Sequence, residues 1–124
     1  MARYGYFPGC SLTGSSREYG ISTVAVFDAL GLELVELSDW SCCGATSGHS
    51  VNRDKADALA SRNLALAADQ GFAELVVPCA SCFNRTKRAA AIVAEGGGRK
   101  RLIESLLGRS LSGGVRVVHP VEIL

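Results

Sequence analysis

A chain of 124 residues is long enough for one domain with a single hydrophobic core, and a content of 48% hydrophobic and 20% charged residues is typical of a folded globular protein. Thirteen basic and twelve acidic residues leave a net charge of +1, so the protein has no strong positive electrostatic field that would attract nucleic acid. No apolar run approaches the roughly twenty residues that cross a bilayer, and the N-terminus does not open a secretory signal, so we expect a cytoplasmic protein without a transmembrane segment.

The first part of the chain predicts a strand followed by a helix. Residues 2–7 contain two tyrosines and stop at Pro8-Gly9, which is typical of a short strand. A capping-box pattern at 15–18 then begins a helix that Gly31 ends. Most of this helix is apolar, so we expect it to be covered on more than one side, with a partner domain or a second copy on the outer side. Its regularly spaced apolar residues are Ile21, Val24, Phe27 and Leu30.

The middle of the chain predicts two further strands with a helix between them. Residues 32–37 alternate apolar and acidic side chains, as in a strand that has one more polar face or lies at a sheet edge. The Ala- and Leu-rich segment 52–70 predicts a helix that Gly71 ends. Residues 72–77 are apolar more continuously, which predicts a more central strand that stops at Pro78.

The last part of the chain predicts two helices and a strand. A helix over 81–95 directs Ala89, Ile92 and Val93 toward the core, and the three glycines 96–98 break it before a short helix over 99–107. Residues 115–118 form the last strand. Strands and helices that alternate in this way predict a single α/β domain, Rossmann-like, in which a roughly four-stranded parallel sheet carries helices on its faces.

Five cysteines follow the predicted strands, namely Cys10, Cys42, Cys43, Cys79 and Cys82. Because the carboxyl ends of parallel strands share one edge of a sheet, we expect a metal site at that edge. An odd number of cysteines in a reducing compartment argues against a framework of disulfides and for metal binding or thiol chemistry. A disulfide between the neighbours Cys42 and Cys43 would have poor geometry, whereas both thiolates can reach one inorganic centre above their turn.

Three interpretations of these cysteines remain open on the residues alone. Soft thiolates are typical ligands of iron–sulfur centres, which we favour. A structural zinc site would use four of the five cysteines. A thiol–disulfide oxidoreductase would use Cys79 and Cys82 alone, but this leaves the other three cysteines unexplained.

The sequence around the cysteines resembles the CCG cysteine-rich domain of heterodisulfide reductase, as found in the B-type polypeptide of that enzyme. The spacing between the cysteine groups agrees with that family, and four stretches carry the resemblance: Phe7-Pro8-Gly9-Cys10-Ser11-Leu12, Cys42-Cys43-Gly44-Ala45-Thr46, Pro78-Cys79-Ala80-Ser81-Cys82-Phe83-Asn84-Arg85 and His119-Pro120-Val121-Glu122. In that family the motif holds a non-cubane 4Fe-4S cluster. The resemblance therefore implies that all five cysteines bind such a cluster. Some relatives are thought to hold zinc, so zinc remains the alternative.

The resemblance also implies a function and partners. Members of the family pass electrons through the cluster to a small-molecule disulfide substrate, within multi-subunit electron-transfer complexes. Their polypeptide has two CCG halves, and residues 1–124 resemble the N-terminal half. We therefore expect an oxidoreductase module that pairs with a second CCG domain and other subunits, is inactive alone and can form a homo-oligomer when isolated. The alternative is a zinc-binding structural or interaction module without redox activity.

Other polar residues carry weaker signals. His49 follows the cysteine pair, and His119 is expected to end a strand. Histidines at such positions are more often solvent-exposed or structural than metal ligands. Three basic residues follow Cys82 and could offset the negative charge of a cluster or receive an acidic substrate: Arg85, Lys87 and Arg88. No nucleotide-binding or hydrolase motif is recognisable.

Overall fold

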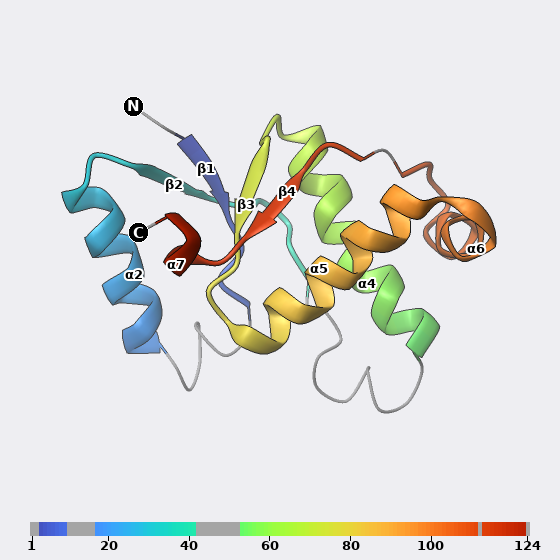
Figure 1. Cartoon of the computed structure of the whole chain (residues 1–124), viewed down its shortest axis with the longest axis horizontal. Coiled ribbons are helices and arrows are strands. Elements are labelled where there is room, and N and C mark those ends of the chain that lie inside the picture. Colours follow the sequence, from blue (N-terminus) through green and yellow to red (C-terminus); the bar gives the residue numbers. More distant parts are fainter. Residues whose placement is uncertain (1–2, 10–16, 42–52, 112, 124) are drawn as a thin grey trace.

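The structure is a computed structural model that describes residues 3–9, 17–41, 53–111 and 113–123, with the backbone alone for 17–19. None of the described helices is long and apolar enough to cross a bilayer. The elements in chain order (Figure 1) are β1 (Arg3–Tyr6), α2 (Arg17–Ala29), β2 (Glu33–Glu36), α4 (Arg53–Asp69), β3 (Glu74–Val76), α5 (Ala80–Glu95), α6 (Gly97–Leu107), β4 (Arg116–Val118) and α7 (Pro120–Ile123).

Four parallel strands form the sheet in the order β2-β1-β3-β4. β1 pairs along its whole length with β2, from Arg3 opposite Glu33 to Tyr6 opposite Glu36. β3 lies between β1 and β4 and pairs with both. The predicted single α/β domain with a parallel sheet is thus confirmed. The predicted edge position of the second strand and the more central position of the third are also confirmed.

Helices cover both faces of the sheet (Figure 1). α4 and α5 lie on one face with α6 packed against them, and α2 and α7 lie on the other. Tyr6 and Val76 are buried with Phe27 of α2. The residues that follow them, Phe7 and Val77, are buried in the second core, which contains side chains of α4 and α5. Because successive side chains of an extended chain point to opposite faces, short strands can supply two cores.

Two elements differ from the sequence prediction. Gly96 ends α5 with a φ of +71°, but the next two glycines belong to α6 and do not separate the helices. Glycine weakens a helix by about 1 kcal/mol, and the burial of Ile103 in the core of this layer offsets that effect. The short α7 was not predicted, because four residues carry no periodic pattern. It begins after His119, whose N–H donates to the Glu122 carboxylate at 2.9 Å.

The outer side of α2 is exposed. Of the four regularly spaced apolar residues, only Phe27 is buried, and Ile21, Val24 and Leu30 are 59%, 43% and 58% exposed. Apolar groups clustered on a surface are typical of interaction sites. The described part of this chain therefore covers one side of the helix and leaves the other side uncovered.

A buried carboxylate joins the three helices of the other layer. Asp57 of α4 is 1% exposed and accepts hydrogen bonds from Arg88 of α5 at 3.0 Å and from Arg99 of α6 at 2.6 Å. Arg99 also pairs with Asp54 of α4. Burial raises the pKa of Asp57, but the hydrogen bonds and positive charges of Arg88 and Arg99 together lower it more, so the pKa lies below its ordinary value of 3.8. The ionised carboxylate therefore holds α4, α5 and α6 together.

We expect Asp57→Asn to lower the free energy of unfolding at pH 7 by about 2 kcal/mol, because hydrogen bonds to a buried charged group contribute about that much. The pKa of Asp57 is lower in the folded chain than its ordinary value of 3.8, so its contribution is present above that pH and is lost as the pH falls through the folded-state pKa. Urea denaturation of the parent chain and the variant at pH 7 and at a series of decreasing pH values below 3.8 measures this difference.

The control is Asp54→Asn, which removes only a half-exposed partner of Arg99 and should have a smaller effect. A loss of stability in Asp57→Asn that does not become smaller at any pH in this series would contradict the assignment of Asp57 as the charged centre of this layer.

Candidate metal centre

Three neighbouring strands, which end at one edge of the sheet, each precede a cysteine group in the sequence. β2, β1 and β3 are adjacent and parallel, and each leads at its carboxyl end to one cysteine group. Among the described residues, no group of three or more His, Cys, Asp or Glu side chains is arranged to hold a metal ion. Of the predicted cysteines the structure places Cys79 and Cys82, and four candidates lie outside the described residues: Cys10, Cys42, Cys43 and His49.

Cys79 and Cys82 lie at the start of α5. Cys79 is the N-cap residue, and its carbonyl accepts the N–H of Phe83 at 2.8 Å. The half-buried side chain of Cys79 makes no capping hydrogen bond, and Cys82 is buried in the first turn. The N-terminus of a helix carries partial positive charge and unpaired N–H groups, which favour anionic ligands and thiolates. Both cysteines therefore lie at the positive end of a helix, where a negatively charged centre is favoured.

The backbone that precedes Cys10 lies against Cys82. Gly9 has a φ of +77°, and a Cβ atom at this position would lie 2.6 Å from Sγ of Cys82 and 3.9 Å from Cβ of Cys79. No side chain fits into this space, so both the backbone conformation and the close contact require glycine. The residue that directly precedes Cys10 therefore lies beside Cys82.

An aromatic contact joins the segments that precede the first and second cysteine groups. The ring centroids of Phe7 and Trp40 lie 5.3 Å apart. The Leu37 N–H donates to the Tyr6 carbonyl at 2.8 Å, which continues the contact between the first two strands beyond their ends. Ser41, the last described residue before the cysteine pair, therefore follows a segment that is anchored to the end of β1.

His119 links the end of β4 to the turn that carries Cys79. Its Nδ1 accepts the N–H of Val121 at 3.2 Å, so Nε2 carries the proton and donates to the Pro78 carbonyl at 3.1 Å. The ring also lies edge-on to Phe83 of α5. His119 follows the last strand, as the sequence predicts, and both of its ring nitrogens are engaged. Its role here is to support the Cys79 turn.

Arg85, a half-buried cation in the second turn of α5, has one buried donor atom without a partner among the described residues. Nη1 of Arg85 is buried and has no hydrogen-bond partner among the residues that the structure describes. Arg85 follows Cys82 by three residues in α5, so the two are neighbours on the helix surface. Helical side chains lean toward the N-terminus of their helix, which for Arg85 is the turn that carries Cys82. An unpaired buried donor destabilises a protein by about 1–3 kcal/mol. An anion that accepted a hydrogen bond from Nη1 of Arg85 would remove this destabilisation.

These features fit a negatively charged centre bound by thiolates. Two soft sulfur atoms lie at a positive helix end, a glycine allows close approach of the backbone, and one buried nitrogen of the Arg85 guanidinium lacks an acceptor among the described residues. Such a donor set suits iron–sulfur clusters and also zinc. The residues present are therefore compatible with either metal.

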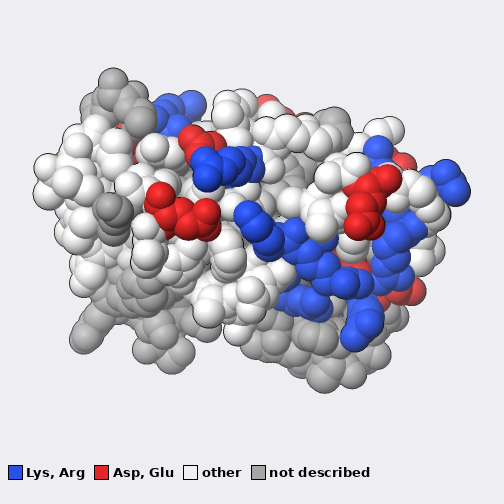
Figure 2. All heavy atoms as spheres, viewed as in Figure 1, with Lys and Arg blue, Asp and Glu red and all other residues white. Residues whose placement is uncertain are grey.

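Positive side chains gather over α5 and α6 (Figure 2). Two of the three basic residues that follow Cys82 are engaged elsewhere. Arg88 pairs with Asp57, and Lys87 Nζ donates to the Val117 carbonyl at 3.2 Å. Of these three cations, Arg85 alone has a buried donor without a partner in the described part of the chain.

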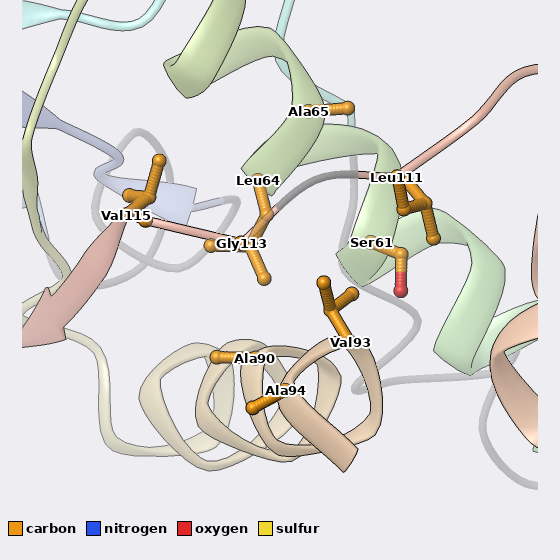
Figure 3. A pocket seen from close by; sticks show the side chains of 10 residues that line it. Ser61, Leu64, Ala65, Ala90, Val93, Ala94, Leu111, Gly113 and Val115 are labelled. Atoms are coloured by element: carbon orange, nitrogen blue, oxygen red, sulfur yellow. The ribbon is translucent and has the colours of Figure 1, made fainter. Parts of the chain in front are cut away.

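A hollow of about 220 Å³ has neither Cys79 nor Cys82 in its lining (Figure 3). It is bounded by α4, α5 and the segment before β4, and its described lining is mainly apolar, with Leu64, Val93 and Leu111 among the contributors. The hydroxyl of Ser61 in this lining is buried and has no partner among the described residues. The described lining of the hollow contains no charged residue and no cysteine.

Comparison with known proteins identifies the family. The family model of the CCG cysteine-rich domain matches residues 4–87, which is more than half of the chain and includes every cysteine. The chain belongs to the CCG cysteine-rich domain family. The resemblance noted in the sequence is thus confirmed.

Two relatives show the kind of protein in which this CCG domain occurs. A B-subunit-like protein of heterodisulfide reductase from Archaeoglobus profundus is 36% identical over 91 residues, which are 72% of this chain and 30% of the relative. The 8-methylmenaquinol:fumarate reductase membrane anchor subunit of Wolinella succinogenes is 34% identical over 106 residues, which are 86% of this chain and 36% of the relative. The chain spans about a third of the length of these relatives. Both relatives are named for reductases.

The sequence analysis did not identify two buried polar residues of α4 that bind other segments of the chain. Asp57 and Asn63 are buried in that helix, where each binds residues of another segment. Asp and Asn are poor helix formers, so their presence in an Ala- and Leu-rich helix was the sequence signal that they have another role. Buried polar side chains need partners, but the partners lie far away in the sequence.

We expect Gly9→Ala to destabilise the reduced chain more than Gly31→Ala does. Gly31 has a similar φ of +75°, but nothing lies within 4 Å of a Cβ atom there. Both substitutions should cost about 1 kcal/mol for the left-handed conformation. Gly9→Ala should cost about 1–3 kcal/mol more, because the methyl group overlaps the Cys82 sulfur.

Urea denaturation measures the difference, and the rate of Cys82 alkylation reports whether its sulfur has moved. Equal stability of the two variants, with unchanged alkylation of Cys82, would contradict the close contact between Gly9 and Cys82.

Proposed function

We propose that this CCG domain binds a non-cubane 4Fe-4S cluster and takes part in electron transfer. The observation that carries the proposal is the close approach of Gly9, the residue before Cys10, to the sulfur of Cys82. Membership of the CCG family and the relative named for heterodisulfide reductase support an iron–sulfur centre. The proposed ligands are Cys10, Cys42, Cys43, Cys79 and Cys82.

The described residues have separate tasks in this proposal. Cys79 and Cys82 supply thiolates from the start of α5, and Gly9 lets the backbone approach them. The Arg85 guanidinium offers its buried donor to the negative charge at this edge. His119 holds the Pro78 carbonyl and so steadies the turn before Cys79. When bound, the cluster supplies an electron carrier whose potential depends on hydrogen bonds, charge and burial.

We further propose that the electrons pass to the disulfide of a small molecule. Reduction of a disulfide takes two electrons and two protons and releases two thiols, so the domain needs an electron donor from another subunit. The isolated domain is then inactive, and the oxidoreductase activity belongs to a heterodisulfide reductase-like complex. Residues 1–124 correspond in this proposal to the first of two CCG domains. The greater length of the relatives supports a larger assembly.

The exposed side of α2 supports an association with another domain. Ile21, Val24 and Leu30 are exposed there, and Val121 of α7, on the same face of the sheet, is 72% exposed. A second CCG domain or another subunit would cover this apolar surface. In the isolated chain, a second copy would do the same and produce a homo-oligomer.

A zinc-binding structural or interaction module is the second candidate function. The spacing of Cys79 and Cys82 at the start of a helix suits zinc as well as iron. In that case the domain has no redox activity, and one cysteine is not a ligand.

Metal content after anaerobic reconstitution separates the two functions. We expect about four iron and four sulfide per chain, with an electron paramagnetic resonance signal from the oxidised sample. Replacement of each cysteine in turn by serine should change that signal or the iron content, because every one of the five is a proposed ligand. One zinc per chain, no sulfide and one cysteine that can be replaced without effect would contradict the cluster and support the structural module.

Removal of the charge of Arg85 should change the reduction potential. We expect Arg85→Gln to lower the midpoint potential, because a positive charge beside the centre favours the reduced and more negative state. Arg101→Gln removes an exposed charge of α6 and is the matched control. Redox titration followed by electron paramagnetic resonance measures both variants. Equal potentials for Arg85→Gln and the parent chain would mean that Arg85 does not act on the centre.

A further inference from the structure

Helix α4 holds the segment that leads to the second cysteine group. Gln70, directly after the helix, binds both main-chain groups of Ser38, with two hydrogen bonds of 3.0 Å. Arg62 donates to the carbonyl of Asp39 at 2.9 Å and to its carboxylate at 2.8 Å. Asn63 binds the end of the same segment. Side chains of the helix and of the residue that follows it therefore contact three of the four residues from 38 to 41.

Asn63 makes the contact that lies nearest to the cysteine pair. It is completely buried, its Oδ1 accepts the Ser41 N–H at 3.0 Å, and its Nδ2 donates to the Ser41 carbonyl at 2.8 Å. One side-chain amide thus pairs with both main-chain groups of the residue that directly precedes Cys42. Asparagine is a poor helix former, and burial of its amide is unfavourable without hydrogen bonds. The contact with Ser41 is what explains an asparagine in the middle of this helix.

The turn that α4 holds contains a strained residue. Asp39 has a φ of 62°, and it is the one residue other than glycine with a positive φ in the described part of the chain. A left-handed conformation is unfavourable for a residue with a side chain and persists where surrounding contacts determine it. The two hydrogen bonds from Arg62 are such contacts. The path of the backbone from 38 to 41 therefore depends on α4 and not on local preference alone.

We propose that Asn63 is a positioning residue for the metal centre, an inference that rests on the function proposed above. By binding the Ser41 N–H and carbonyl together, Asn63 sets the direction in which the backbone enters the Cys42–Cys43 pair. Two neighbouring thiolates reach one centre only from a limited range of backbone directions. Residues that hold metal ligands in place typically change metal affinity by about 10–100-fold when they are replaced.

The test compares four full-length proteins after anaerobic reconstitution: the parent chain, Asn63→Ala, Asn63→Ser and Gln70→Ala. Gln70→Ala is the matched control, because it removes the same kind of two-bond contact three residues earlier in the segment. Asn63→Ser is the milder variant in case the alanine variant does not fold, which circular dichroism reports. The measurements are the loss of the cluster to an iron chelator over time and the electron paramagnetic resonance spectrum.

We expect the cluster half-life to fall at least about tenfold in Asn63→Ala, with a changed spectrum, and to fall in the same direction in Asn63→Ser. Gln70→Ala should stay within about twofold of the parent and keep its spectrum. A parent-like half-life and spectrum in the folded Asn63 variants would overturn the proposal. Equal losses in Gln70→Ala and Asn63→Ala would also overturn it, because general loosening of the segment would then explain both.

A parent chain that takes up no iron and sulfide would refute the proposed cluster but would not by itself decide the role of Asn63. In that case the same four proteins are compared for zinc affinity by competition with a chromogenic chelator. Zinc binding at least about tenfold weaker in the Asn63 variants, with Gln70→Ala near the parent, would support the positioning role. Equal zinc affinities, or a parent chain that binds neither metal, would overturn it.

Discussion

The backbone of Gly9 lies so close to the sulfur of Cys82 that a Cβ atom at residue 9 would be 2.6 Å away. This contact requires β1 and β3 to be neighbours and requires α5 to begin as soon as β3 ends. A parallel sheet satisfies both requirements, because the carboxyl ends of its strands share one edge. On the other side of β1, the contact of Trp40 with Phe7 adds the segment after β2. The strand order β2-β1-β3 therefore explains how cysteines distant in the sequence can serve one centre.

Much of the fold could be predicted from local patterns. The alternation of Leu and Glu over 32–37 indicated an edge strand, and the continuous apolar run over 72–77 indicated a central one, as the sheet order confirms. Pro8, Gly31 and Gly71 marked the ends of elements correctly. The start of α6 could not be predicted, because its glycines are held by the burial of Ile103 and the ion pairs of Arg99.

The residues that support the candidate site could not be predicted, because their contacts join distant segments. Asn63 lies 22 residues from Ser41, and Asp57 lies 31 residues from Arg88. No short motif pairs them, and only the packing of α4 against its neighbours brings them together. The cysteine motif itself was visible in the sequence because its spacing is characteristic. The sequence thus indicated the chemistry of the ligands, and the structure adds the residues that orient the segments before them.

Helix α4 connects the stability of the domain to its proposed function. Near its start, Asp57 joins it to α5 and α6 through two arginines. Six residues later in the same helix, Asn63 binds the residue before the cysteine pair. α5 begins directly after Cys79. The ion pair of Asp57 with Arg88 therefore joins α4, which binds the residue before Cys42, to α5, which contains Cys82.

X-ray absorption at the iron and zinc edges of the anaerobically reconstituted chain tests most directly whether the three cysteine groups bind one iron–sulfur centre. We expect iron surrounded by sulfur, with iron–iron scattering from a cluster and no zinc. Zinc surrounded by sulfur, without iron–iron scattering, would contradict the proposed electron-transfer function and leave a structural metal site.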